Sequence, residues 1–317
     1  MTKLLVAVPC REAVIHRFER EFPHQLDITF ANEDPAIIAR AISEAEVIIG
    51  EPAPELLPQA THLKWMQITW AGADRYTGRF PADVTLTNAS GAFGRIISEY
   101  TLGMILNQYK QLYKYYVNQK NLLWEDLGRE RSLLNNRVLI LGTGDVGSHI
   151  AQKLHAFGTY NIGVNRSGRS AEHFDEIYPL EQLDALLPQA DIVIGALPKT
   201  PDTIGLLDRR RMQLMRKDAL LVNVGRGSMI VTEDLEFMLD QGYFFGVVLD
   251  VMDPEPLPVT SSLWKTQRVL LTPHICGIGF GHESATEDTI WDICFQNLRH
   301  YLAGEPLDHI VDTRAGY

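Results

Sequence analysis

The sequence has few cysteines, no long apolar run and fewer basic than acidic residues, and each shortage excludes a class of protein. The three cysteines, Cys10, Cys276 and Cys294, share no metal-ligand spacing, which argues against a zinc site and for a reducing compartment. The longest apolar runs, such as residues 219–224, are far shorter than the roughly 20 residues that a membrane helix requires. We therefore expect a cytoplasmic protein with no metal site and no membrane-spanning segment.

Basic residues are outnumbered, because 29 Lys and Arg stand against 40 Asp and Glu, a formal charge of −11. Such a chain repels the phosphate backbone of nucleic acid unless its basic residues are gathered into a patch. The basic cluster at 209–217 lies in a helical pattern, which is most simply a solvent-exposed helix face. We expect neither nucleic acid nor a membrane as a partner.

The length of 317 residues favours two domains of roughly 150 residues each. From residue 137 onward, short apolar runs alternate with helical patterns, which predicts an α/β domain with a doubly wound parallel (Rossmann) sheet. The helices are expected at 146–156, 180–187 and 232–240, with Thr232 as the N-cap of the last. The expected strands are 137–141, 161–165, 191–197, 219–224, 246–250 and 269–272.

The first 90 residues also alternate, which predicts a second, smaller flavodoxin-like α/β domain with strands at 3–8, 45–50, 65–69 and 84–87 and a helix at 12–21. One long helix is expected at 93–120. A last helix at 283–302 follows the final strand, so we expect it to return to the first domain. The predicted domains are a substrate domain, 1–95 plus 284–317, and a dinucleotide-binding domain, 96–283.

A glycine turn follows the expected strand at 137–141 and opens the next helix, which is the context that gives this otherwise weak pattern its meaning. Gly142 permits a tight turn, Gly144 lets the backbone approach a pyrophosphate, and Gly147 lets helix and strand pack closely. The amides of the helix N-terminus then attract the anion. The turn predicts a nicotinamide dinucleotide site at Gly142, Thr143, Gly144, Asp145, Val146 and Gly147.

The end of the second strand of this domain carries Asn165, Arg166 and Ser167, where a site for NAD places an acid against the ribose hydroxyls. A carboxylate there repels a 2′-phosphate, whereas Arg166, helped by Ser167, pairs with it through charge-assisted hydrogen bonds. The absence of an acid also argues against a methyltransferase. We therefore predict that NADPH is preferred and that NADH is possible.

Three charged side chains follow later strands, at the edge where an open α/β sheet binds its ligands. Arg226 is flanked by glycines, Glu255 lies between two prolines, and His274 follows a proline. Each side chain alone is better explained by a structural role. Their occurrence together and in this order predicts a catalytic site.

Because it carries these motifs, the sequence resembles the D-isomer-specific 2-hydroxyacid dehydrogenase family over nearly the whole chain. Within that family, it is similar to the glyoxylate and hydroxypyruvate reductases. The resemblance implies an enzyme that acts on the CH–OH group of donors and transfers a hydride between NAD(P)H and a small 2-keto acid, giving the D-2-hydroxy acid. The matching stretches are 70–74, 87–88, 98–99, the glycine turn, 197–203, 222–228, 249–258 and 271–277.

The resemblance implies that His274 is the general acid and that Glu255 is its partner, since a carboxylate beside an imidazole stabilises the charged ring and holds its tautomer. It implies that Arg226 binds the substrate carboxylate and polarises the carbonyl through its fork of donors. Backbone amides of Ala71 and Gly72 would join this carboxylate site. Trp70 would narrow the pocket.

The resemblance also assigns a set of residues to the cofactor cleft, namely Leu197, Pro198, Thr203, Val224, Asp250 and Gly277, with Asp250 near the nicotinamide. It implies a homodimer with Trp124 at the interface. The physiological 2-keto acid stays open at this point.

Two alternatives remain. A phosphoglycerate dehydrogenase shares the three charged segments, although Glu51 stands in a loop where such enzymes tend to carry arginines for the phosphate. A dinucleotide-sensing corepressor retains the same residues, although such relatives usually carry disordered extensions.

Overall fold

The computed structural model describes residues 1–80, 83–281 and 284–312. The chain divides into two compact units: unit 1, Met1–Ala92 with Ile278–Tyr317, and unit 2, Phe93–Gly277. No helix among the described residues is long and apolar enough to cross a bilayer.

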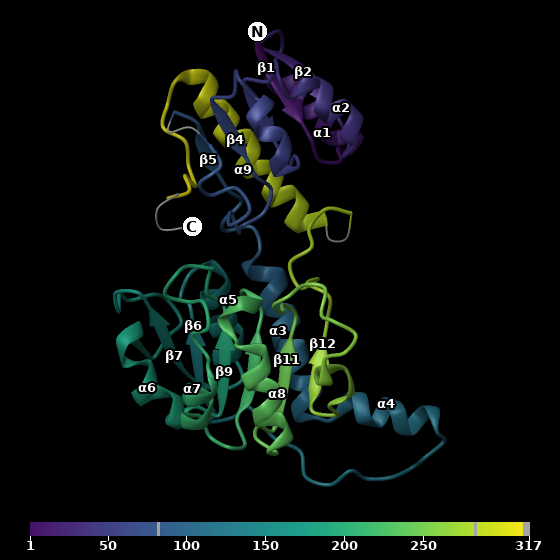
Figure 1. The fold of residues 1–317 in the computed structure, drawn as a ribbon, viewed down its shortest axis with the longest axis vertical. Helices are drawn as coiled ribbons and strands as arrows, with labels where there is room; N and C mark the ends of the chain where they lie inside the picture. The colour runs from purple at the N-terminus through teal and green to yellow at the C-terminus, as the bar shows by residue number, and fades with distance from the viewer. Residues whose placement is uncertain (81–82, 282–283, 313–317) are drawn as a thin grey trace. The chain divides into compact units, whose positions relative to one another are not determined.

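Unit 1 contains a five-stranded parallel sheet in the order β2-β1-β3-β4-β5, which is the flavodoxin-like order. The central strands are short apolar runs that are buried on both faces, as parallel sheets require. The strands are β1 (Thr2–Val6), β2 (Leu26–Phe30), β3 (Val47–Ile49), β4 (Trp65–Gln67) and β5 (Thr85–Thr87), and the helices are α1 (Glu12–Glu21), α2 (Pro35–Ala41), the 3-10 helix η1 (Pro54–Gln59) and α9 (Ser284–Ala303) (Figure 1).

Strand β2, helix α2 and the 3-10 helix η1 of unit 1 were missing from the sequence prediction. Strand β2 alternates apolar and polar residues and lies at the sheet edge, where it is only partly buried. Helix α2 is short, although Asp34 caps it through the N–H of Ala36 and Pro35 stands at its first position. The expected helix at 283–302 is found as α9; residue 283 lies outside the described residues.

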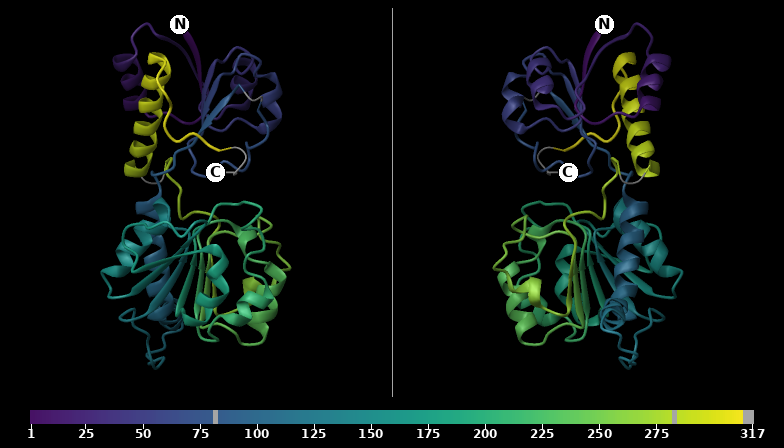
Figure 2. Two further views of the ribbon diagram at one scale, coloured as in Figure 1. Left: turned by 90° about the vertical axis from the view of Figure 1, so that its left-hand side faces the viewer. Right: turned by 90° about the vertical axis from the view of Figure 1, so that its right-hand side faces the viewer.

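Unit 2 contains a seven-stranded parallel sheet in the order β12-β11-β10-β9-β6-β7-β8, which is the Rossmann order extended by one strand. Helices α3 and α5 cover one face of this sheet and α7 and α8 the other (Figure 2). The strands are β6 (Arg137–Leu141), β7 (Tyr160–Asn165), β8 (Glu176–Pro179), β9 (Ile192–Gly195), β10 (Leu220–Asn223), β11 (Gly246–Leu249) and β12 (Val269–Leu271). The helices are α3 (Gly94–Tyr109), α4 (Leu112–Lys120), α5 (Asp145–His155), α6 (Leu183–Leu186) between η2 (Leu180–Gln182) and η3 (Leu187–Gln189), α7 (Arg209–Leu214), η4 (Gly227–Met229), α8 (Thr232–Asp240) and η5 (Ser262–Lys265).

The predicted fold class is confirmed, and three local predictions in unit 2 were wrong. Edge strand β8 was missed because its four residues are only partly buried. The expected helix at 93–120 breaks at Gln111, whose φ of 53° is left-handed. Thr232 is the first residue of α8 and not its N-cap, since its hydroxyl donates to the carbonyl of Asp253 and Val231 precedes the helix.

The basic cluster of α7 is held by acidic neighbours. Arg210 and Arg211 both pair with Asp184, and Arg209 pairs with Asp234. Each of these three guanidinium groups therefore already faces a carboxylate.

Candidate active site

The glycine turn lies between β6 and α5, next to the point where the strand order of unit 2 reverses. Gly142 has a φ of 109°, and a Cβ there would lie 2.7 Å from the carbonyl oxygen of Ala196. A Cβ at Gly147 would lie 1.9 Å from the carbonyl oxygen of Gly142. Side chains are therefore excluded at both positions, as the spacing predicted.

The same turn has the features that a dinucleotide phosphate requires. A Cβ built on Gly144 meets nothing within 4 Å, so the space beside this residue is open. Gly144 is the N-cap of α5, and no side chain caps the amides of the first turn. An 11-residue helix whose N-terminal amides face open space offers an anion site. The residues present therefore fit the pyrophosphate of a dinucleotide.

The segment after β7 is organised by the side chain of Asn165. Its Nδ2 donates to Oγ1 of Thr143 at 2.9 Å and to the carbonyl of Arg169 at 2.8 Å, and its Oδ1 accepts from the N–H of Ser167 at 3.1 Å. Asn165 thus ties the glycine turn to the loop that exposes Arg166 and Ser167. The sequence analysis grouped Asn165 with the residues expected to bind the cofactor, and in the structure its side chain braces the loop that carries Arg166 and Ser167.

Arg226 stands after β10 between two glycines that leave no room for a side chain. A Cβ at Gly225 would lie 2.8 Å from the carbonyl oxygen of Leu197, and one at Gly227 would lie 1.9 Å from that of Met252. The backbone on both sides of Arg226 is therefore packed against neighbouring segments, while its own carbonyl accepts from Asn223 at 3.0 Å. This packing holds the base of the guanidinium side chain in place.

His274 and Glu255 form a pair at the same edge of the sheet. Nδ1 of His274 lies 2.9 Å from Oε2 of Glu255, and Oε1 of Glu255 accepts from the N–H of Met252 at 2.9 Å. The carboxylate is thus fixed by a backbone amide and in turn orients the ring. Because Nδ1 is engaged by the acid, Nε2 is the nitrogen left to exchange a proton with a substrate.

Asp250 organises the segment that carries His274, a role that sequence reasoning did not assign. Its buried carboxylate accepts from the hydroxyl of Thr272 at 2.6 Å and from the N–H groups of Ile275 and Cys276 at 3.0 Å. Its carbonyl accepts from the N–H of His274 at 2.8 Å, and the φ of His274 is 55°. These hydrogen bonds hold the histidine in a backbone conformation that favours glycine.

A second contribution to this network comes from α3. The hydroxyl of Tyr100 is hydrogen-bonded to Oγ1 of Thr272, and burial raises the pKa of Tyr100 well above its ordinary value. Burial likewise raises the pKa of the Cys276 thiol, followed by the influence of Asp250. Local sequence patterns carry no signal for Tyr100, because it lies 172 residues from Thr272.

The remaining residues predicted for the cofactor cleft lie around these segments. Thr203 is buried, and its hydroxyl donates to the carbonyl of Pro198 at 2.7 Å, which closes the 198–203 loop. The backbone of Leu197 lies against Gly225. The N–H of Val224 donates to the carbonyl of Gly195 at 3.0 Å. A Cβ at Gly277 would lie 3.2 Å from the side chain of Ile97.

Unit 1 presents the loop predicted to bind a carboxylate, residues 69–72, after β4. The carbonyl of Trp70 accepts from the N–H of Ala89 at 2.9 Å, and that of Ala71 accepts from Nδ2 of Asn88 at 2.8 Å. Across the residues the structure describes, the N–H groups of Ala71 and Gly72 have no acceptor. The loop therefore combines fixed carbonyls with free amides, which suits an anion. The indole of Trp70 is 40% exposed and lies 5.5 Å from the guanidinium of Arg75.

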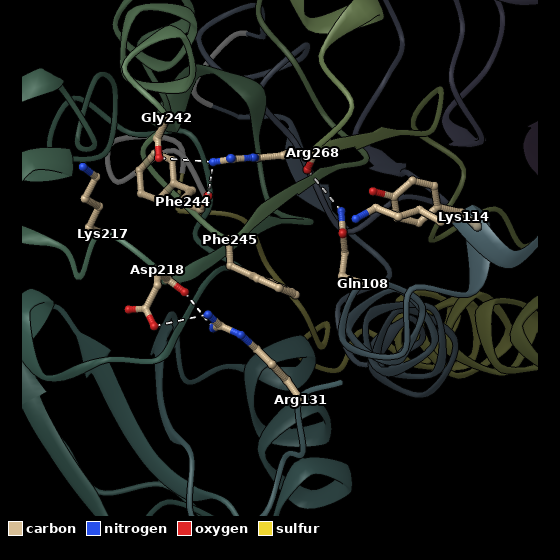
Figure 3. A pocket seen from close by; sticks show the side chains of 10 residues that line it. Gln108, Lys114, Arg131, Lys217, Asp218, Gly242, Phe244, Phe245 and Arg268 are labelled. Carbon is tan, nitrogen blue, oxygen red and sulfur yellow. Dashed lines mark hydrogen bonds and ion pairs between the residues drawn. The ribbon is translucent and has the colours of Figure 1, made fainter. Parts of the chain in front are cut away.

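A cavity of about 440 Å³ in unit 2 is a different feature. It lies where β10, β11 and β12 begin, at the edge opposite Arg226 and His274. Figure 3 shows that both of its arginines are already engaged, since Arg131 binds Asp218 and Arg268 donates to the carbonyls of Gly242 and Phe244. The cavity lies away from the edge that carries Arg226 and His274.

Comparison with known proteins identifies the family. Residues 102–276, more than half of the chain, match the model of the D-isomer specific 2-hydroxyacid dehydrogenase, NAD binding domain. The chain belongs to the D-isomer specific 2-hydroxyacid dehydrogenase family. The prediction drawn from the motifs is thereby confirmed.

Individual relatives agree with this assignment over most of their length. A glyoxylate/hydroxypyruvate reductase A of Serratia proteamaculans is 30% identical over 85% of this chain and 87% of its own. A solved structure of a family protein from Aeromonas salmonicida has a TM-score of 0.89 at 34% identity, covering 98% of this chain and 99% of its own. An NADPH-dependent glyoxylate/hydroxypyruvate reductase from Sinorhizobium meliloti, solved with NADP and sulfate, has a TM-score of 0.84 at 28% identity and covers both chains fully.

The family assignment settles the general chemistry. This 2-hydroxyacid dehydrogenase is an oxidoreductase that uses a nicotinamide dinucleotide, and the binding domain for that cofactor lies in unit 2.

Proposed function

We propose that this dehydrogenase reduces a small, unphosphorylated 2-keto acid, of the glyoxylate or hydroxypyruvate type, to the D-2-hydroxy acid with NADPH. The hydrogen-bonded pair of His274 and Glu255, at the same sheet edge as Arg226, carries the proposal. The bound dinucleotide supplies the hydride. The substrate class is that of the reductases from Serratia and Sinorhizobium named above.

The reduction needs a proton at the keto oxygen, and we assign its delivery to Nε2 of His274. Glu255 holds Nδ1 and stabilises the protonated ring. Arg226 binds the substrate carboxylate, because a guanidinium offers two parallel N–H donors to it. In the reverse reaction the same ring accepts the proton from the hydroxyl.

We assign the substrate domain to unit 1, where the free amides of Ala71 and Gly72 bind the carboxylate and Trp70 limits the size of the pocket. The side chain of Glu51 lies beside this loop, with its carboxylate 2.5 Å from the N–H of Thr69. An acid at this place offers a substrate phosphate no positive partner, and its ionised form repels one, which favours an unphosphorylated acid.

The preference for NADPH rests on the end of β7. Arg166 and Ser167 are exposed there, in the loop braced by Asn165, and no acid occupies the segment 165–169. A 2′-phosphate gains charge-assisted hydrogen bonds from Arg166, whereas a ribose hydroxyl gains little.

A steady-state panel tests both parts of the proposal. Purified enzyme is assayed with glyoxylate, hydroxypyruvate, phenylpyruvate and 3-phosphohydroxypyruvate, each with NADPH and with NADH. The expected result is the highest kcat/KM for one of the unphosphorylated acids with NADPH. Equal kcat/KM for the two cofactors would reject the cofactor preference, and the highest value for the phosphorylated acid would reject the substrate class.

We further propose a cytoplasmic homodimer, formed through an arm made of residues 112–131. Helix α4 buries none of its residues and extends away from the sheet of unit 2 (Figure 1). Leu122 is 94% exposed and Trp124 fully exposed, and exposed apolar side chains gathered in one segment mark an interface. The three free cysteines suit the reducing cytoplasm.

The arm is tested by substituting Trp124→Glu and measuring the molar mass by light scattering. The monomer mass is expected for this variant, and the dimer mass for the wild type and for the control Val259→Glu, which changes an equally exposed apolar residue outside the arm. A dimer mass for Trp124→Glu would reject the arm as the interface.

A further inference from the structure

Glu51 is a charged residue that the proposed reaction does not use. It follows β3 at the point where the strand order of unit 1 reverses, between β1 and β3. Ligands of open α/β sheets bind beyond the carboxyl ends of the strands at such a reversal. The contacts of a carboxyl group placed there therefore decide its role.

The residue before it directs the chain into this position. Gly50 has a φ of +117°, and a Cβ there would lie 2.9 Å from Cγ1 of Val8. Its N–H donates to the carbonyl of Gln67 at 2.9 Å. The turn after β3 is thus fixed against both β1 and β4, and it delivers Glu51 to the end of β4.

The carboxylate of Glu51 is occupied by the start of the 69–72 loop. Oε1 accepts from the N–H of Thr69 at 2.5 Å and from its hydroxyl at 3.0 Å, and Oε2 lies 3.1 Å from the same hydroxyl. Thr69 itself is buried. One side chain thus accepts from both the backbone N–H and the hydroxyl of Thr69, which holds the start of the loop in place.

The other end of the loop is held by different elements. Ala89 donates to the carbonyl of Trp70, and Asn88 donates to the carbonyl of Ala71. With Thr69 held by Glu51, the loop is fixed at both ends, while the amides of Ala71 and Gly72 stay available. Fixed amides bind a carboxylate better than mobile ones, because their ordering is not lost from the binding free energy.

We infer that Glu51 is a positioning residue for substrate binding, which holds the 69–72 loop so that the amides of Ala71 and Gly72 face the carboxylate of the 2-keto acid. The inference rests on the proposed function, since it assumes that this loop binds the substrate. Glu51 contacts neither the substrate nor the cofactor in this role. Its loss therefore raises the KM for the keto acid more than it lowers kcat.

The test compares Glu51→Ala, Glu51→Gln and the control Glu55→Gln, which changes an exposed carboxylate in the neighbouring 3-10 helix. Two readouts are used: steady-state constants with hydroxypyruvate and NADPH, and amide hydrogen exchange of residues 66–75 without substrate. Removing the acceptor is expected to raise the KM for the keto acid about 10-fold. The KM for NADPH is expected to stay unchanged, and exchange in the loop to accelerate.

Glu51→Gln is expected to lie between the wild type and Glu51→Ala in both readouts, because its amide oxygen still accepts from Thr69. An unchanged KM and unchanged exchange in Glu51→Ala, with an active wild type, would overturn the inference. A parallel rise in both KM values with a fall in the melting temperature would also overturn it, because that result indicates a general loss of structure.

The test also allows for an inactive wild type and for a variant that does not fold. If the wild type reduces no 2-keto acid but Glu51→Ala accelerates loop exchange, the proposed function fails while the bracing of the loop stands. If Glu51→Ala does not fold, Thr69→Val takes its place, since it removes the hydroxyl contact and keeps the N–H. A raised KM for the keto acid is then expected, and an unchanged one overturns the inference.

Discussion

The two sheets of this dehydrogenase have the same parallel architecture but present different chemistry where their strands end. In unit 2, the edge carries the side chains of Arg226, Glu255 and His274, two of which are hydrogen-bonded to each other. In unit 1, the edge carries the 69–72 loop, which is held by Glu51, Asn88 and Ala89 and in which the amides of Ala71 and Gly72 have no acceptor among the described residues. Proton transfer needs a titratable side chain, whereas carboxylate recognition can be built from backbone. The difference suggests that the units divide these tasks.

The strongest test of this division removes the imidazole. His274→Ala is expected to lower kcat by about 10²- to 10⁴-fold, the range for loss of a general acid. Steady-state assays measure the effect, and His155→Ala, at an exposed position at the end of α5, is the control. Turnover within about twofold of the wild type would show that the edge of unit 2 does not supply the proton.

In unit 2, the proposed cofactor site depends on backbone geometry at the glycine turn. Gly147→Ala puts a methyl group 1.9 Å from the carbonyl oxygen of Gly142, which is expected to cost about 1–3 kcal/mol or more of stability and to weaken NADPH binding. Gly103→Ala is the matched control, since a Cβ there meets nothing within 4 Å and the residue lies inside α3. It is expected to stabilise the protein by about 0.5–1 kcal/mol. Denaturant unfolding and NADPH titration measure both.

The next prediction concerns the network beneath His274. Thr272→Val removes the hydroxyl that donates to Asp250 and contacts Tyr100. Leaving buried polar groups without a partner costs about 1–3 kcal/mol, so the variant is expected to unfold at lower denaturant concentration and to have a reduced kcat. Thr289→Val, an exposed position on α9, serves as the control. Wild-type kcat and stability would mean that His274 does not depend on this network.

The smallest effect concerns the pH dependence contributed by unit 1. Burial raises the pKa of Glu51 to about 7, partly opposed by hydrogen bonds from Thr69 and Trp70. The folded protein therefore holds this proton to a higher pH than the unfolded chain, and the stabilisation is present below the ordinary pKa of the acid and lost as the pH rises through about 7.

Glu51→Gln removes this titration, so its melting temperature relative to the wild type is expected to rise between about pH 5 and pH 8. Thermal unfolding at several pH values measures the difference, with Glu55→Gln as the control. A constant difference across this range would show that Glu51 titrates as an ordinary surface acid.

The sequence predicted those parts of the fold and site that local patterns encode. The apolar run at 137–141 became β6 with the same bounds, and the glycines at 142 and 147 stand where a side chain cannot fit. Edge strands β2 and β8 were missed because partial burial weakens the apolar pattern on which a strand prediction depends. The break at Gln111 was missed because nothing in its neighbours excludes a continuous helix.

What the sequence determined by itself was the family, the sheet type and the identity of the charged side chains, since each depends on residues close together in the chain. Tertiary structure alone decided the contacts that support the site. Tyr100 meets Thr272 across 172 residues, and Glu51 meets Thr69 across 18. Such contacts arise because parallel strands bring their carboxyl ends to one edge, and a hydrogen bond formed there leaves no local pattern in the sequence.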